Sequence, residues 1–189
     1  PTFDATCRGY AYLIDSDALL AVVNDHCFSS SSSSAMGDQM ISSEIFVYVL
    51  DKILQKLEDA ELDYFAFSFG KVKTQTTLCS LFRARASLVS ASNFNDDNQH
   101  SPRAICIELV GNRFLRRMVR ILVATAIREV VKILEEDGSH MATMETEVKL
   151  EEIEESRLLS LIEGGDRILS AKAGSPSGLI FVGSRFRNA

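Results

Sequence analysis

The sequence predicts an α+β fold, in which an antiparallel or mixed β-sheet carries helices on one face. Three observations lead to this prediction. Residues 77–89 alternate between apolar and polar side chains, as a strand buried on one side does. Residues 103–110 (RAICIELV) have the composition of a second strand, the expected hairpin partner of the first. Residues 40–58 carry apolar side chains at helical spacing. We expect residues 1–189 to form a single domain of this class.

The first expected strand covers residues 8–14 (RGYAYLI). Six consecutive serines at 29–34 are too polar to pack, so the sequence predicts a flexible insertion near 28–39. The expected 40–58 helix has a wide apolar face, made of Ile45, Phe46, Val49, Leu50, Ile53, Leu54 and Leu57.

The 77–89 strand is expected to place Phe82, Ala84, Ala86 and Leu88 on one face and Arg83, Arg85 and Ser87 on the other. A polar loop at 90–102 leads to the second strand. A long helix then runs to about Leu134, followed by a flexible insertion near 136–149 and a helix at about 150–162. A turn rich in Gly, Ser and Pro precedes the last expected strand, Gly178–Val182.

The charge of the chain is unevenly distributed. The formal net charge is -6, yet residues 135–156 hold nine acidic residues and one lysine. The rest of the chain is therefore mildly basic, at +2.

Several classes of protein are excluded or disfavoured by composition. No apolar run approaches the roughly 20 residues that span a bilayer, and no signal peptide is visible. The four cysteines are widely spaced without a C-x-x-C pattern, and Asp25-His26-Cys27 has no second cluster to complete a metal site. We therefore expect no disulfide framework and no metal. The chain starts at Pro1 without Met, so we expect it to be part of a longer protein.

The stretch GNRFLRRMVRILVATAIREV (111–130) concentrates positive charge in an apolar run. On a helix its arginines would share one sector of roughly 120°, at about 100° per residue: Arg113, Arg116, Arg117, Arg120 and Arg128. One interpretation is an ordinary amphipathic helix whose cationic face is solvated. All basic residues in this sector are Arg and none is Lys, and a wide apolar sector borders them on both sides. Both features favour phosphate or nucleic-acid binding, because guanidinium groups bind phosphate and carboxylate in a bidentate way.

Four segments of the sequence resemble the motifs of one protein family and follow one another in the same order as in that family. They are residues 3–12 (FDATCRGYAY), 63–67 with 73–77 (DYFAF, KTQTT), 112–120 (NRFLRRMVR) and 166–169 with 178–182 (DRIL, GLIFV). They resemble the motifs F-x-A-x-x-R-x-Y-x-Y, H-D-F-x-x-F with R-T, N-x-F-x-x-x-M-V-R, and D-R-x-L with G-L-x-x-V. These motifs belong to the C-terminal half of the tRNA pseudouridine synthase A (TruA) family. The third match is the most specific.

This resemblance implies isomerisation of uridine to pseudouridine in the tRNA anticodon arm, without cofactor or metal. It also implies an essential aspartate on an R-T/S-D-x-G-V-H loop of the N-terminal half. No such loop occurs here, so the chain alone is expected to be inactive. Arg120 matches the family arginine that pairs with this aspartate. Tyr10 matches the tyrosine that stacks on the target base, and Leu179 matches the apolar floor under that base.

The expected partners follow from the same resemblance. Arg8, Arg113, Arg116 and Arg117 would hold tRNA phosphates. A homodimer is common in the family, although core packing explains the apolar face of the 40–58 helix equally well. The location would be intracellular, with cytoplasm, nucleus and mitochondrion all open. Two alternatives remain: a non-catalytic RNA-binding or dimerisation module of the same fold, and a small-ligand domain with a fortuitous arginine helix.

Overall fold

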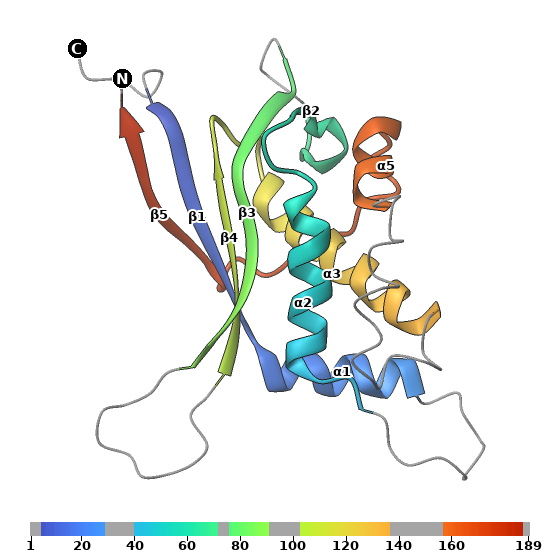
Figure 1. Cartoon of the computed structure of the whole chain (residues 1–189). Coiled ribbons are helices and arrows are strands. Elements are labelled where there is room, and N and C mark those ends of the chain that lie inside the picture. Colours follow the sequence, from blue (N-terminus) through green and yellow to red (C-terminus); the bar gives the residue numbers. More distant parts are fainter. Residues whose placement is uncertain (1–4, 29–39, 72–75, 91–102, 137–156, 187–189) are drawn as a thin grey trace, which may run out of the picture.

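The computed structural model describes residues 5–28, 40–71, 76–90, 103–136 and 157–186. These residues build an antiparallel sheet in the order β2-β3-β4-β1-β5 (Figure 1). The strands are β1 (Ala5–Asp15), β2 (Glu61–Asp63), β3 (Leu78–Ser90), β4 (Arg103–Gly111) and β5 (Leu179–Phe186). The serine run, residues 91–102 of the polar loop and most of the acidic segment lie outside the described residues.

Helices cover one face of this sheet, which confirms the predicted α+β class (Figure 1). They are α1 (Ser16–Phe28), α2 (Ser43–Gln55), the short 3₁₀ helix η1 (Tyr64–Phe67), α3 (Met118–Glu136) and α5 (Arg157–Gly164). Among the described residues, no helix is both long and apolar enough to cross a membrane.

The hairpin of β3 and β4 is confirmed, with a register that runs from Ser90↔Arg103 to Arg83↔Val110. A bulge between Leu81 and Arg83 shifts the alternation at that point. Phe82, predicted to face inward with Ala84, is therefore 49% exposed, and that part of the prediction is wrong.

Two carboxylates protect the outer edge of β3. The N–H of Ala84 donates to Glu58 Oε1 at 2.7 Å, and the N–H of Ala86 donates to Asp51 Oδ1 at 2.8 Å. Arg85 binds Glu58 on the same edge, with 2.8 Å between Nη2 and Oε2. Edge N–H groups that are already bonded cannot recruit another strand, so α2 and the turn after it close this side of the sheet.

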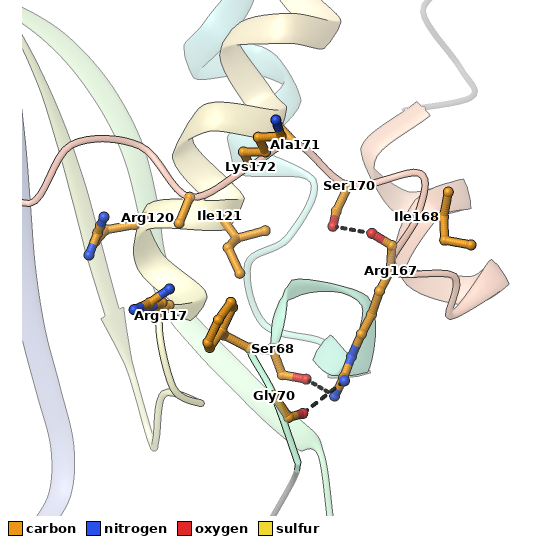
Figure 2. A pocket seen from close by; sticks show the side chains of 12 residues that line it. Ser68, Gly70, Arg117, Arg120, Ile121, Arg167, Ile168, Ser170, Ala171 and Lys172 are labelled. Atoms are coloured by element: carbon orange, nitrogen blue, oxygen red, sulfur yellow. Dashed lines mark hydrogen bonds between the residues drawn. The ribbon is translucent and has the colours of Figure 1, made fainter.

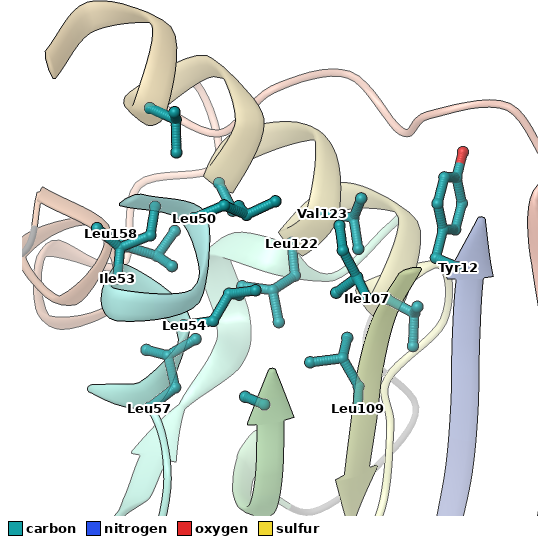
Figure 3. Close-up of a cluster of buried hydrophobic side chains, with 14 of the residues drawn as sticks. Tyr12, Leu50, Ile53, Leu54, Leu57, Ile107, Leu109, Leu122, Val123 and Leu158 are labelled. Carbon is teal, nitrogen blue, oxygen red and sulfur yellow. The ribbon is translucent and has the colours of Figure 1, made fainter. Parts of the chain in front are cut away.

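The core lies between the sheet and helices α2 and α3. Figure 3 shows the apolar side of α2 packed toward α3 and β4. The largest side chains that are fully buried in the core include Phe46, Leu50, Leu54, Leu57, Ile107, Leu109, Met118 and Leu122. The apolar face of α2 is thus used in the core of this chain.

Helix α1 has no counterpart among the predicted elements. It follows β1 directly, and the Asp15 carboxylate accepts the N–H of Ala18 at 2.9 Å. An aspartate that accepts an N–H three residues on is a common helix N-cap. Asp15 was therefore the signal in the sequence that could have predicted α1.

Candidate functional site

The residues between β4 and α3 do not form the helix that the sequence predicts. Helix α3 begins at Met118, so Arg113, Arg116 and Arg117 precede it. The predicted stripe of five arginines on one helix is therefore wrong. The break lies at Arg117, whose φ of 61° is left-handed. That conformation costs a non-glycine residue about 1–2 kcal/mol.

Asn112 ties the start of this loop to β3. Its N–H donates to Ser80 O at 3.1 Å, and its Oδ1 accepts the N–H of Ser80 at 3.0 Å. Phe114 then packs edge-on against Tyr10 of β1, with 5.0 Å between ring centroids. These contacts with two strands hold the loop in a shape that local helix propensity would not produce.

A second segment, residues 166–178, runs along α3 and forms a wall of the site. Arg128 Nη2 donates to Leu169 O at 2.6 Å. One turn earlier in α3, the buried hydroxyl of Thr125 accepts the N–H of Ala171 at 3.0 Å. The segment is therefore fixed to α3 at intervals of about one helical turn before it reaches β5.

Arg120 makes the third attachment to this segment, to which it both donates and accepts a hydrogen bond. Its Nε donates to Gly174 O at 2.7 Å, and its carbonyl oxygen accepts the N–H of Gly174 at 3.2 Å. No described residue pairs with its two terminal nitrogens, Nη1 and Nη2. The guanidinium is therefore oriented by one bond and keeps four N–H groups for another acceptor.

A pocket of about 560 Å³ lies between α3, the 166–178 segment and the turn after η1 (Figure 2). Of the described residues that line it, four are cationic and none is acidic: Ser68, Phe69, Gly70, Arg117, Arg120, Ile121, Arg167, Ile168, Ser170, Ala171, Lys172 and Ala173. Figure 2 shows Arg117 and Arg120 on one side of the pocket and Arg167 on the other. The pocket can therefore hold an anion.

The cationic residues of the pocket are not equivalent. Arg167 is committed to the turn after η1, since it donates to Gly70 O at 2.8 Å and to Ser68 Oγ at 2.6 Å. Its guanidinium also lies 4.0 Å from the ring centroid of Phe65. The Arg117 guanidinium lies over Phe69 instead, at 3.9 Å from the ring centroid. Arg167 thus shapes the pocket, whereas Arg117 remains exposed at its edge.

The register of the sheet places the other predicted catalytic residues. Tyr10 pairs with Phe181 of β5, and Tyr12 pairs with Leu179. Tyr10 and Tyr12 share the face that carries α3, because alternate strand residues point the same way. Tyr10 and Leu179 do not line the pocket of Arg120. Tyr10 instead contacts two rings, those of Phe114 and Phe181.

The remaining predicted RNA contacts lie apart from one another. Arg8 is on β1, opposite Gly111 and Ser184. Arg113 lies in the loop after β4, and its charge acts on the Cys79 thiol of β3. Burial raises the pKa of the Cys79 thiol to about 11, and the charge of Arg113 acts in the opposite direction. Of the four predicted phosphate ligands, only Arg117 lines the pocket.

Tyr12 is a site residue that the sequence did not single out. Its Oη donates to Ser175 O at 2.6 Å. Burial raises the pKa of Tyr12, and the charge of Arg120 lowers it in part, so the hydroxyl stays protonated and donates at neutral pH. Tyr12 thus fixes the end of the 166–178 segment to β1, next to Arg120.

Replacing Tyr12 with phenylalanine is expected to lower the free energy of unfolding by about 1 kcal/mol, because one hydrogen bond is lost while the ring stays. Urea denaturation of the full-length protein measures this change. Tyr48→Phe on α2, where the ring is 37% exposed, is the control and should stay within about 0.5 kcal/mol of wild type. A Tyr12→Phe protein as stable as the control would mean that water replaces the bond.

None of the ion pairs among the described residues includes a residue that lines the pocket. Their acidic members are Glu44, Asp51, Glu58, Glu108, Glu129 and Glu135. No group of three or more His, Cys, Asp or Glu side chains that could hold a metal occurs in the described ranges. The pocket therefore combines positive charge with hydrogen-bond donors.

No protein-family model matches the chain, and no curated protein matches it in sequence.

Proposed function

We propose that this chain is the C-terminal part of the catalytic domain of a tRNA pseudouridine synthase. Arg120 carries the proposal. It stands in the most specific of the four motifs, its Nε is held by Gly174, and its terminal nitrogens have no carboxylate partner among the described residues. This is the arrangement that a carboxylate supplied by another part of the protein requires.

The reaction rearranges one nucleotide without net gain or loss of atoms. The bond from N1 of uracil to C1′ of ribose breaks, the base turns, and C5 bonds to C1′. The proton on C5 leaves and N1 gains one. An ionised aspartate from the N-terminal half of the protein would act on the substrate. Arg120 would keep that carboxylate charged and oriented, since a nearby cation lowers a carboxyl pKa.

Tyr10 and Leu179 would act on the base itself. Both lie on the sheet face that carries α3, and the register sets them diagonally across β1 and β5. The Tyr10 ring would stack on the turned-out base, and its hydroxyl would take part in proton transfer. Leu179 is partly buried against the core and would provide an apolar floor. Arg116 and Arg117 are exposed and would contact tRNA phosphates.

A non-catalytic RNA-binding module is the second candidate, because exposed arginines without described carboxylate partners serve phosphate binding equally well. The two candidates differ in a single observable. An isomerase releases tritium from tRNA labelled at C5 of uridine, whereas a binding module retains the label while it binds the tRNA.

The full-length protein is expected to release this tritium, and Tyr10→Phe is expected to lower kcat by about 100-fold. The substitution removes a hydroxyl and keeps the ring contacts with Phe114 and Phe181. The affinity for tRNA should stay the same, because the stacking surface remains. Tyr48→Phe serves as the control and should release tritium at the wild-type rate.

One result would count against the isomerase, and another would change only the role of Tyr10. Wild-type protein that binds tRNA without releasing tritium would support the non-catalytic module. An active wild type with an equally active Tyr10→Phe variant would limit Tyr10 to stacking and leave the isomerase proposal intact.

A further inference from the structure

We propose that Phe69 and Arg117 form a clamp for a backbone phosphate of the RNA, at the edge of the pocket that contains Arg120. This inference rests on the function proposed above and deepens it. Phe69 belongs to none of the four motif matches. Three contacts give it this role.

The first contact is the stack itself. The Arg117 guanidinium lies 3.9 Å from the centroid of the Phe69 ring, and that of Arg116 lies 5.5 Å from it. A guanidinium stacked on an aromatic ring loses its freedom to rotate but keeps its N–H groups at the edge of its plane. Those groups bind two phosphate oxygens in the same plane. The ring therefore prepares Arg117 for a phosphate.

The second contact joins the two loops. The N–H of Phe69 donates to Arg116 O at 3.0 Å, so the turn after η1 and the loop before α3 are bonded by their backbones. Arg117, the next residue, has the left-handed φ of 61°. Strain of this kind in a non-glycine residue often marks a functional position. Here it accompanies the placement of an arginine over Phe69.

The third contact fixes the turn that carries Phe69. Arg167 binds Phe65 O at 3.2 Å, Gly70 O at 2.8 Å and Ser68 Oγ at 2.6 Å, as Figure 2 shows in part. A guanidinium with three acceptors on one short turn holds it in a single shape. Phe69 is 44% exposed and yet sits on a rigid support.

The charge around the clamp selects the ligand. The described residues that line the pocket include no Asp or Glu. Neither Arg116 nor Arg117 has an ion pair with a described residue. An exposed face of this kind attracts a polyanion. An RNA phosphodiester fits a planar pair of N–H donors, and Arg120 next to it remains available for the catalytic carboxylate.

The test measures binding of an unmodified tRNA transcript to the full-length protein over a series of salt concentrations. Arg117→Gln is expected to weaken binding roughly fivefold at about 0.15 M salt, which is what one phosphate contact contributes. The slope of log K against log salt should become shallower by about one. Phe69→Ala should have the same two effects, and Phe69→Tyr should restore both.

Two comparisons make the result specific. Arg83→Gln removes an equal charge from the open face of the sheet, where Arg83 pairs with Glu108 at 2.8 Å, and is expected to bind like wild type. The double variant Phe69→Ala/Arg117→Gln should lose about fivefold, as each single variant does. A loss of roughly 25-fold would show that the two residues act independently, and the clamp would be rejected.

Other outcomes separate the clamp from the proposed reaction. Variants that release tritium normally and bind as wild type does would reject the clamp and leave the isomerase standing. Salt-dependent binding that falls in both variants, without tritium release from wild type, would support the clamp and reject the isomerase. A wild-type protein that binds no transcript would reject both and favour an acidic protein as the ligand of the pocket.

Discussion

Replacing Arg120 with alanine in the full-length protein is expected to lower kcat/KM for pseudouridine formation by about 1000-fold. The substitution removes the cation that would keep the catalytic aspartate ionised and oriented. It also removes the bond from Nε to Gly174 O. Arg120→Lys keeps the charge but cannot offer two parallel N–H groups, so it should recover only part of the rate. Tritium release from C5-labelled tRNA measures both variants.

The pH dependence gives a second reading of the same role. A neighbouring cation lowers the pKa of a carboxylate, so wild-type activity should persist to lower pH than the activity of Arg120→Ala. The acid limb of the rate profile should therefore move to higher pH in Arg120→Ala and less in Arg120→Lys, which keeps the charge. Arg83→Ala, on the other face of the sheet, is the control for loss of charge. Wild-type activity in Arg120→Ala would refute the role assigned to Arg120.

Gly178→Ala is expected to lower the free energy of unfolding by about 3 kcal/mol, which is near the upper range for overpacking. A Cβ at this position would lie 2.3 Å from Leu13 O and 3.1 Å from Tyr12 Cε1. Because the nearest atom belongs to the backbone of β1, it cannot rotate away. The melting temperature of the full-length protein should fall by roughly 6–12 °C, as differential scanning calorimetry would measure.

A matched glycine is available in the next strand. Nothing lies within 4 Å of a Cβ at Gly183 of β5, and its φ is not positive. Gly183→Ala should therefore leave stability unchanged or raise it by about 0.5 kcal/mol. If Gly178→Ala and Gly183→Ala melted at the same temperature, the close approach of residues 174–178 to β1 would be contradicted. Loss of pseudouridine formation should accompany the instability, since this segment binds Arg120 through Gly174.

Periodic patterns predicted β3 and α2, whereas α1 and β2 were not predicted. Residues 103–110, which were predicted as a strand from their composition, form β4, in which buried Ile105, Ile107 and Leu109 alternate with more exposed residues. A strand with one buried face needs only this alternation to be recognised. The bulge at Phe82 could not be predicted in this way, because it depends on how β3 meets Gly111 at the end of β4.

The candidate site was predicted less completely. The motif at residues 112–120 predicted Arg120 as a site residue from the sequence alone. The sequence also predicted that Arg113, Arg116 and Arg117 would continue the same helix, and the structure shows that they precede it. Helical spacing was a poor guide there, because Asn112 and Phe114 are bound to strands that lie far away in the sequence.

The sequence by itself determined which residues alternate, which recur at helical spacing and which motifs follow one another. These properties depend on neighbours a few positions apart. The tertiary structure alone decided where α3 begins, why Arg117 lies over Phe69, and how Tyr12 and Arg120 meet the 166–178 segment. Arg120 and Gly174 are 54 residues apart, and Tyr12 and Ser175 are 163 apart. Contacts at such separations form only when the whole core is assembled, because they gain their free energy from surfaces that no single segment contains.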